Sequence, residues 1–347
     1  LHYPLRRQRQ MCIRDSFYTN KTPGSIHKLL AQGFIHKVHQ GGPASVVYAA
    51  ENNINAAETL TSVVNAQIPH HRSAKIPVQY LNTVIGKMSQ TVNLEELDHP
   101  NTLAPLVADY PKAILVEAFN QIMISKITEL PNFSKGIDVF QEKSDLEPYE
   151  ELKLYGHNAI HAALGYLAAC LRVKTISETR DIPELMAFIR SIFLDEVGVG
   201  LCKKYHQVDI LFTRDGFDAY AEDLLNRMVN PLLMDSVSRV TRDVNRKLGW
   251  EDRLIGALRL CMGQGIEPNN LAFAIAATLY HAAGEDVNQI PNVMKQYHEV
   301  WLRQSKNPRA VETVVELINL GVSQLINWQR TSFSPDMLKT LAGPNQP

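Results

Sequence analysis

The sequence of 347 residues is poor in cysteine, with only Cys12, Cys170, Cys202 and Cys261. These residues stand far apart and none belongs to a CxxC pair, which argues against a disulfide framework and a cysteine-rich zinc site. This usage fits a reducing compartment, and we expect a cytoplasmic location. The first residues contain no apolar stretch that would predict a secretory signal peptide.

An excess of charge of one sign is also missing. Lysine and arginine number 35 against 36 aspartate and glutamate, which gives a formal net charge of -1. Aromatic residues make up 7% and do not alternate with basic runs. We therefore expect no nucleic acid as a partner, and we expect no membrane. The length and the ordinary hydrophobic content predict a globular protein of about two domains.

The first 16 residues follow no structural pattern. They begin with Leu1, are rich in arginine and show no hydrophobic periodicity. We interpret residues 1–16 as non-native or disordered, in front of an N-terminally truncated fragment. The alternative is a basic tail that contacts nucleic acid.

Residues 17–144 have α/β character. A helical stretch at residues 28–38 precedes the apolar, β-branched run ASVVYAA at residues 44–50, and a second helix follows at residues 55–66. This order is typical of a parallel α/β sheet. Residues 76–88 read as a strand or turn, and residues 113–124 as another apolar run. The GxGxxG fingerprint is absent from the sequence, and Gly41-Gly42 does not replace it, because no strand leads into this pair.

Residues 145–330 read as an all-helical domain. Proline stands at or near the first turn of several of its segments, where a missing N–H has no cost. The expected helices cover roughly residues 149–173, 183–195, 217–227, 231–245, 251–263, 268–282, 290–304 and 308–328. Residues 331–347 are expected to form a loose tail.

One expected helix carries several polar groups on an apolar face. No charged residue stands between Lys153 and Arg172. This length matches a membrane span, but the polar residues inside it favour a buried helix of a globular domain. With Lys153 at 0°, an α-helix places His157 at about 40°, His161 at about 80° and Asn158 at about 140°. The same half-circle contains Leu154, Ile160, Leu164 and Leu167.

These groups can perform proton chemistry. Burial lowers the pKa of a lysine toward neutrality, so Lys153 can act as a general base. Asn158 can donate a hydrogen bond to an oxygen that develops charge, and His161 can hold a neighbouring hydroxyl. Two alternatives stay open. Lys153 can extend to solvent while the histidines are satisfied core residues, or His157 and His161 can bind a metal through their i, i+4 spacing. No third ligand stands at motif spacing, so we expect no metal.

The pattern Lys153-x4-Asn158-x2-His161, after Asp145-Leu146-Glu147-Pro148-Tyr149, resembles the signature of the polyol-specific long-chain dehydrogenases. The resemblance covers roughly residues 40–330, and two more stretches within this range agree with the family. Glu51-Asn52-Asn53 resembles its Cys-Glu/Asp-Asn segment. Arg246-Lys247-Leu248, followed by Asp252-Arg253-Leu254, resembles a stretch of its mannitol-1-phosphate branch.

The resemblance implies a fold and a reaction. It implies a Rossmann-type domain, here incomplete and without its glycine-rich loop, followed by a helical domain like that of 6-phosphogluconate dehydrogenase. Family members transfer a hydride to NAD or NADP without zinc; we expect NAD, with NADP left open. The predicted reaction interconverts a hexitol phosphate and a ketose phosphate, of the mannitol 1-phosphate and fructose 6-phosphate type.

The resemblance also assigns roles to residues. Lys153 would be the general acid/base, Asn52 and Asn158 would stabilise the alkoxide, and His161 would orient the substrate. The candidates for the substrate phosphate are Arg246, Lys247 and Arg253, whose alternative reading is a solvated basic helix end.

One departure bears on the substrate. The family usually has an Asp-Arg pair about thirty residues after the Asn52 position, where this sequence offers Asn82-Thr83. The alternative functions are therefore a dehydrogenase for unphosphorylated mannitol or a hexuronate, and a non-catalytic helical binding module. A further alternative is that the fragment itself is inactive.

Overall fold

The computed structural model describes residues 24–51, 55–69, 76–96, 103–108, 110–130, 133 and 135–342. By their contacts the described residues form two compact units. The first contains residues up to 87 together with 118–150, and the second contains 88–117 together with 151 onward. The second unit thus includes residues 88–117, which the sequence analysis grouped with the α/β part.

The first unit is built on a small mixed sheet. Its strands lie in the order β1 (Ser45–Ala49), β2 (Val78–Ile85), β5 (Ile122–Ser125) and β6 (Phe140–Lys143). Strands β1 and β2 are parallel, as expected for an α/β sheet, whereas β5 runs antiparallel to β2. The resulting order is an α/β arrangement with one reversed pairing.

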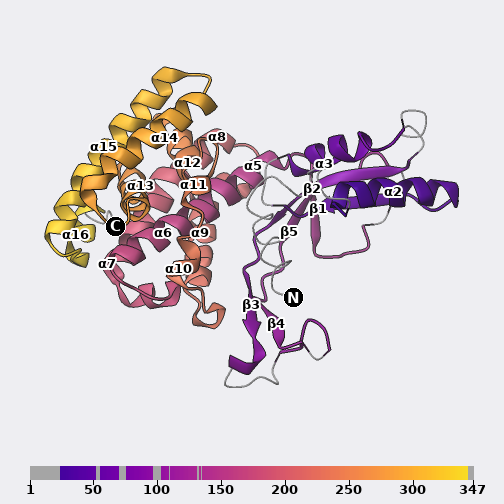
Figure 1. Cartoon of the computed structure of the whole chain (residues 1–347), viewed down its shortest axis with the longest axis horizontal. Helices are drawn as coiled ribbons and strands as arrows, with labels where there is room; N and C mark the ends of the chain where they lie inside the picture. The colour runs from indigo at the N-terminus through magenta and orange to yellow at the C-terminus, as the bar shows by residue number, and fades with distance from the viewer. Residues whose placement is uncertain are drawn as a thin grey trace. The chain divides into compact units, whose positions relative to one another are not determined.

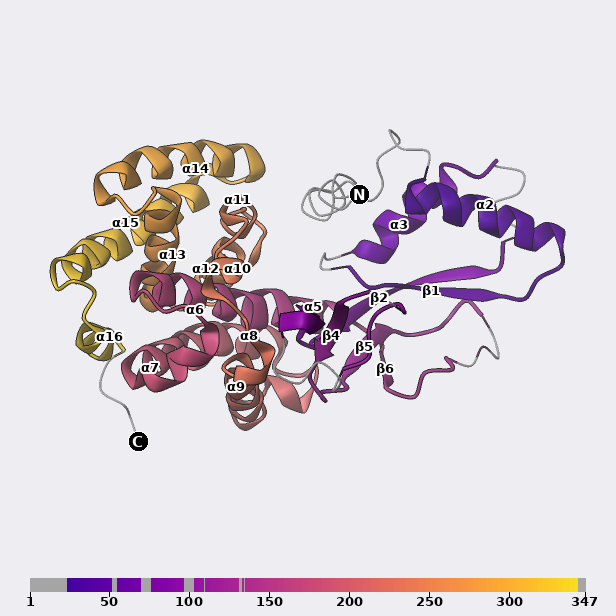
Figure 2. The same cartoon turned by 60° about the horizontal axis from the view of Figure 1, so that its bottom comes forward.

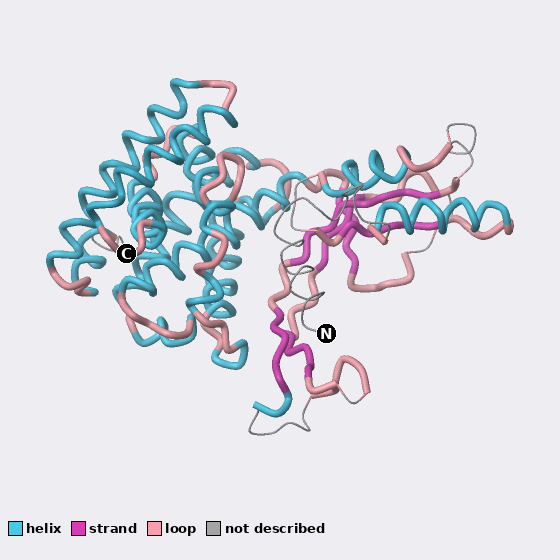
Figure 3. Tube along the Cα trace, in the orientation of Figure 1, coloured by secondary structure: helices cyan, strands magenta, loops and turns pink. Residues whose placement is uncertain are grey.

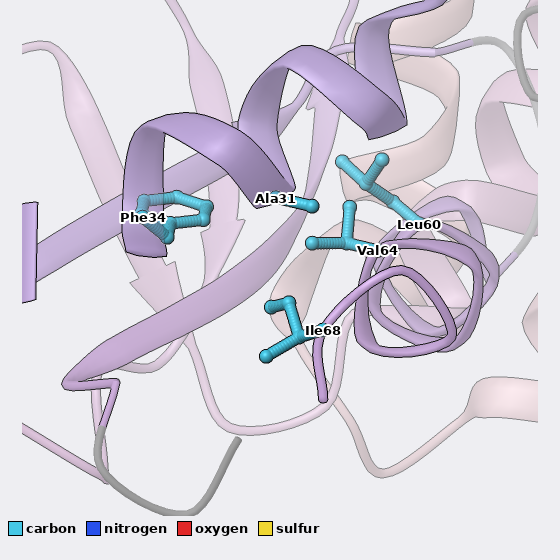
Figure 4. Close-up of a cluster of buried hydrophobic side chains, with 5 residues drawn as sticks. All are labelled: Ala31, Phe34, Leu60, Val64 and Ile68. Carbon is cyan, nitrogen blue, oxygen red and sulfur yellow. The ribbon is translucent and has the colours of Figure 1, made fainter. Parts of the chain in front are cut away.

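Two helices cover β1 and β2. Helices α2 (Ile26–His39) and α3 (Ala56–Asn65) lie side by side over these strands, as Figure 2 shows. Figure 4 shows the side chains that join the helices: Ala31, Phe34, Leu60, Val64 and Ile68. Both helices and β1 agree with the sequence expectation. Gly41, at a φ of 64°, ends α2 rather than forming a phosphate loop.

The apolar run at residues 113–124 is not one element. Its first part belongs to β4 (Lys112–Val116) and its second part to β5, and these strands lie in different sheets and different units. Strand β4 pairs with β3 (Ser89–Asn93), which continues into the short helix η1 (Leu94–Glu96). Sequence alternation alone did not separate the two strands.

The hairpin of β3 and β4 is tied to the helical part of its unit by a buried ion pair. Arg227 binds both carboxylate oxygens of Glu117, with distances of 2.9 Å and 2.6 Å. The same carboxylate accepts a hydrogen bond of 2.6 Å from the backbone N–H of Met88. This two-point contact accounts for the grouping of residues 88–117 with the helices.

The second unit is otherwise helical (Figures 1 and 3). Its longer elements are η3 (Leu152–Asn158), α6 (Ala159–Cys170), η4 (Ile176–Asp181), α7 (Pro183–Ser191), η5 (Ile192–Gly198), α8 (Val199–Tyr205), α9 (Arg214–Met228), α12 (Arg253–Gly263), α13 (Asn269–Ala282), α14 (Ile290–Gln304) and α15 (Pro308–Arg330). Helix α5 (Glu147–Glu151) precedes them, and η6 (Ile210–Phe212) and η8 (Val287–Gln289) are short turns. The observed bounds agree best with the expected ones at α14, which matches residue for residue.

The prediction of one helix over residues 231–245 is wrong. This stretch forms three short pieces instead, η7 (Pro231–Leu233), α10 (Val237–Val240) and α11 (Val244–Lys247). Met234 and Asp243 interrupt it with left-handed φ angles of 47° and 58°. Neither is glycine, so the sequence carried no ordinary signal for the breaks.

The expectation of a loose tail is also wrong where the tail is described. Residues 335–341 form α16 (Pro335–Leu341), which begins with proline in its first turn and packs on α7 through the buried Leu338. Residues 343–347 and residues 1–16 lie outside the described residues.

Helix α13 is the centre of the second unit. It packs against α6, α12, α14 and α15, and its residues 271–280 are all buried. The apolar stretch of α6 is likewise covered by neighbouring helices. In the part of the chain that the structure describes, none of the helices combines the length and apolarity that a bilayer crossing needs.

Candidate active site

The predicted catalytic residues lie on one helical run, in which α5, η3 and α6 follow one another directly. Its middle part, η3, is a π-helix, in which each N–H bonds the carbonyl five residues earlier. Lys153 and Asn158 are five residues apart, so the wider turn brings them toward one face. The α-helical angle of about 140° between them is therefore wrong, because the sequence reading assumed 3.6 residues per turn.

A second π-helix packs against the first. Gly156 of η3 faces the Phe193 ring of η5, and a Cβ built on Gly156 would lie 3.5 Å from that ring. Both π-helices contain a glycine, Gly156 in η3 and Gly198 in η5. π-Helical turns are frequent at functional sites.

Lys153 is largely buried without a balancing charge. Burial, and next the positive charge of Arg253, lower the pKa of Lys153 from 10.5 to about 8. Among the described residues no carboxylate forms an ion pair with its ammonium group. A lysine in this environment exchanges a proton at a pH near neutrality, which general acid/base chemistry requires.

His157 lies in the same group of cationic side chains. It is buried, and its pKa falls well below 6.5, first through burial and then through His161, Lys153, Arg227 and Arg253. The ring is therefore neutral near pH 7. The charges of Lys153, His161 and Arg253 all act on the His157 ring.

His161 contacts a residue that the sequence analysis assigned no role. Its Nε2 lies 3.0 Å from Oδ2 of Asp235, which stands between η7 and α10. Arg239 binds the same carboxylate through distances of 2.7 Å and 2.6 Å. Burial alone would raise the pKa of Asp235, but the contacts with His161 and Arg239 outweigh it and lower the pKa.

Asn158 is half-buried and is engaged in an interaction. Asn52, its predicted partner, lies outside the described residues. The strand before Asn52 is β1, whose last residue, Ala49, lies beside Asn82 of β2. Whether Asn52 joins Lys153 therefore stays a prediction.

The unusual Asn82-Thr83 pair has a structural use. The Asn82 side-chain oxygen accepts a 2.7 Å hydrogen bond from the N–H of Ala57 in the first turn of α3, and its amide group donates to Glu58. Thr83 donates to the carbonyl of Ala49 at 2.9 Å. The two residues thus fix the end of β1 and the start of α3.

The three predicted phosphate-binding residues have different surroundings. Lys247 is buried and donates to the carbonyls of Val240 and Arg242, with its ammonium 5.4 Å from the Tyr166 ring centre. Burial, followed by Arg253 and Arg246, lowers the pKa of Lys247 to about 8. These contacts favour a role for Lys247 in closing the turn after α10.

Arg246 is exposed, whereas Arg253 is buried at 8% exposure. Arg253 begins α12 and binds Asp252 through its Nε at 2.7 Å, and it influences Lys153 electrostatically. Arg246 is 38% exposed and lies 4.0 Å from Asp243. The positive charge of Arg253 acts on both Lys153 and His157, and a cation there suits an anionic ligand.

The sequence assigns no role to Glu150, which stands three residues before Lys153. Burial, and next the carboxylates of Glu58, Glu147 and Asp145, raise its pKa to about 7. A cluster of acidic residues in the sequence around α5 was the signal for this shift.

No metal centre emerges from the described residues, since they contain no group of three or more histidine, cysteine, aspartate or glutamate side chains that could hold an ion. Two cavities of about 500 Å³ lie elsewhere. One is lined by α8 and α9 and the other by α3 and β2, and neither is lined by a predicted site residue.

Comparison with known proteins gives consistent matches. The mannitol dehydrogenase C-terminal domain family matches residues 145–327. A mannitol-1-phosphate 5-dehydrogenase of Caldanaerobacter subterraneus is 32% identical over 223 residues, 64% of this chain and 54% of the relative. The corresponding protein of Brevibacillus brevis is 31% identical over 248 residues, 69% of this chain and 57% of the relative. The chain thus spans about half the length of these relatives.

A solved structure agrees in fold. Mannitol 2-dehydrogenase of Pseudomonas fluorescens, in a ternary complex with NAD and D-mannitol, has a TM-score of 0.64 at 18% identity. The alignment covers 93% of this chain and 67% of that one. The small mixed sheet and the helical part therefore match a Rossmann-like portion and a helical domain.

Proposed function

Since the chain belongs to the mannitol dehydrogenase family, we propose that it forms the substrate-handling part of a nicotinamide-linked polyol dehydrogenase. The proposed reaction interconverts a hexitol phosphate and a ketose phosphate, as the name of the matched relatives suggests. The observation that carries the proposal is Lys153, whose ammonium lies buried in a π-turn with a pKa of about 8.

Lys153 is the proposed general acid/base. During oxidation its neutral amine accepts the proton of the reacting hydroxyl, and during reduction its ammonium returns a proton to the developing alkoxide. The absence of a carboxylate partner within the described residues keeps the proton exchangeable. Asn158, near the same face of the π-turn, would donate a hydrogen bond to that oxygen, and Asn52 would be the second donor.

The substrate phosphate would be held by arginine. Arg253 and Arg246 are the better candidates, because guanidinium groups make paired, charge-assisted bonds to phosphate oxygens. Lys247 already donates to two backbone carbonyls. Its proposed contribution is to shape the turn that carries Arg246.

NAD is the proposed cofactor, and when bound its nicotinamide would accept or supply the hydride. The parallel pair β1 and β2 with the crossover helix α3 fits part of a nucleotide-binding sheet. The described residues contain no glycine-rich turn between a strand and a helix, so the diphosphate has no assigned cradle here. No residue is therefore assigned to the cofactor.

We keep two further sequence predictions as proposals. Residues 17–144 would belong to the incomplete nucleotide-binding side and residues 145–330 to the substrate side, although 88–117 pack with the helices. The protein would act in the cytoplasm on a sugar alcohol or a sugar phosphate, without nucleic acid.

A kinetic experiment tests the proposal. The protein, expressed from its complete reading frame, should oxidise NADH with fructose 6-phosphate and without added metal, and Lys153→Met should abolish this activity. Unchanged turnover in Lys153→Met would contradict the acid/base role. Equal kcat/KM for fructose and fructose 6-phosphate, with Arg253→Gln neutral, would favour the unphosphorylated substrate. If no turnover is seen and a thermal-shift titration detects no nicotinamide binding, the protein is a non-catalytic module.

A further inference from the structure

Resting on the proposed function, we propose that Asp235 is a positioning residue that fixes His161 for substrate binding, with Arg239 as its anchor. His161 stands on α6, whereas Asp235 and Arg239 belong to the irregular stretch from η7 to α10. These two parts of the helical unit meet where His161 contacts Asp235.

The contact is shielded from water. The His161 side chain is 20% exposed and the Asp235 side chain 10%, and Nε2 and Oδ2 lie 3.0 Å apart. Among the described residues Nε2 is buried and makes no well-aligned hydrogen bond, and the Asp235 carboxylate oxygen lies within 3.0 Å of it. Polar contacts of this kind are often misaligned before the substrate binds and tighten in the complex.

The backbone holds Asp235 in place. Its carbonyl accepts a 2.8 Å hydrogen bond from Ile176, and the next residue, Ser236, forms a bridge with Thr175. Met234, just before it, adopts a left-handed φ of 47°, which is uncommon for a residue other than glycine. Such a conformation persists where the surroundings demand it.

The side chain of Asp235 is held equally firmly. Arg239, one turn along α10, binds Oδ1 through Nε and Oδ2 through a terminal nitrogen, at 2.7 Å and 2.6 Å. Oδ2 is thus shared between Arg239 and His161. The guanidinium keeps the carboxylate ionised and restricts its rotation, so that it can orient the imidazole ring.

This arrangement decides the tautomer of His161. A carboxylate accepts hydrogen bonds, so a neutral ring beside it carries its proton on Nε2. Nδ1 then has a free lone pair and can accept a hydrogen bond from a substrate hydroxyl. A substrate polyol offers such hydroxyls next to the reacting carbon, where Lys153 acts.

A double-mutant cycle tests the coupling. Asp235→Asn keeps the size of the side chain and removes its charge, and it should lower kcat/KM for fructose 6-phosphate about tenfold, mainly through a higher KM. His161→Gln should have a similar effect. The double variant should be no worse than His161→Gln alone, since Asp235 acts through His161. Effects of the two substitutions that simply multiply would overturn the proposal.

A matched control distinguishes the positioning role of Asp235 from the effect of losing any ion pair within a helix. Asp218 binds Arg214 at 3.0 Å, also across one helical turn, and within the described part of the chain it forms no ion pair with a histidine. Asp218→Asn should leave the kinetic constants unchanged. A fall in kcat/KM as large as that of Asp235→Asn would mean that the loss is structural, and would count against the positioning role.

A measurement without turnover keeps the two proposals distinguishable. In protein labelled with ¹⁵N-histidine, long-range proton–nitrogen correlations report the tautomer, and His161→Gln identifies the signal. We expect the Nε2–H form in the wild type, and an increased Nδ1–H share in Asp235→Asn. A wild-type Nδ1–H form would overturn the positioning role even in an active enzyme. The Nε2–H form in a protein without dehydrogenase activity would refute the proposed function and leave the pairing intact.

Discussion

Replacing Lys153 by methionine should remove activity and at the same time stabilise the protein. Methionine keeps most of the apolar stem and removes the buried charge. The pKa of Lys153 falls from 10.5 to about 8 through burial and Arg253. At about 1.36 kcal/mol for each pH unit, this difference corresponds to about 3 kcal/mol of lost folding free energy at pH 7.

The sign of this effect depends on pH in a defined way. Below about pH 8 the lysine is protonated in both states, so the folded protein bears the whole cost of burying the charge. Between about pH 8 and 10.5 the folded state releases its proton first, and the cost declines. The stability advantage of Lys153→Met is therefore largest at pH 7 and vanishes above about pH 10.5.

Thermal unfolding followed by circular dichroism measures the difference. For a unit of this size we expect Lys153→Met to raise Tm by about 6–12 °C at pH 7. Lys295→Met, at an exposed position of α14, is the control and should change neither Tm nor activity. A lower Tm for Lys153→Met, or a gain that persists unchanged at pH 10.5, would refute the reasoning.

Three further outcomes follow from the structure. Polyol oxidation should increase as the pH rises through about 8, because it needs neutral Lys153, and ketose reduction should decrease over the same range; initial rates in both directions against pH check this. Arg227→Gln should destabilise the protein by about 3 kcal/mol, because it leaves the buried Glu117 unpaired. In Arg227→Gln, amide hydrogen exchange should also accelerate in β3 and β4. The double variant Arg227→Gln/Glu117→Gln should regain part of the lost stability. Gly321→Ala should lower Tm strongly, because a Cβ at this position lies 2.6 Å from the carbonyl oxygen of Ala272 in α13. The control is Gly263→Ala, whose Cβ meets nothing within 4 Å, so its effect on Tm should be neutral or stabilising.

The regular helices were predictable from the sequence because their local signals agree with their packing. Helix α15 begins after the capping residue Asn307 with Pro308 in its first turn, and its buried residues recur at helical spacing. The strand β1 and the helices around it also follow from short-range patterns. In these elements no distant contact overrides the local preference.

The irregular parts depend on contacts that the sequence does not reveal. Met234 and Asp243 adopt left-handed conformations without glycine. Arg227 and Glu117 are 110 residues apart, and their pairing draws a hairpin to the helices. The inward direction of Lys247 is set by the carbonyls of the turn it closes. Each feature results from tertiary packing, which periodicity cannot report.

The sequence proposes residues for the candidate site but does not predict their geometry. Lys153, Asn158 and His161 follow from polarity on an apolar helix and from the family signature. The π-turn that brings Lys153 toward Asn158, and the Asp235 carboxylate beside His161, required the structure. A helical wheel assumes one angle per residue, and this assumption fails where function uses an irregular turn.

Charge compensation separates the proposed acid/base from the other buried ions of the helical unit. Arg227 is matched by Glu117, Arg253 by Asp252, and Lys247 by two carbonyl oxygens. The Glu196 carboxylate accepts two backbone N–H groups at the start of α13. Lys153 has no comparable partner among the described residues, and its pKa is lowered by burial and then by the like charge of Arg253. An uncompensated buried charge has a stability cost that packing does not require. Its presence in a π-turn, beside hydrogen-bonding side chains, is therefore better explained by proton transfer than by folding.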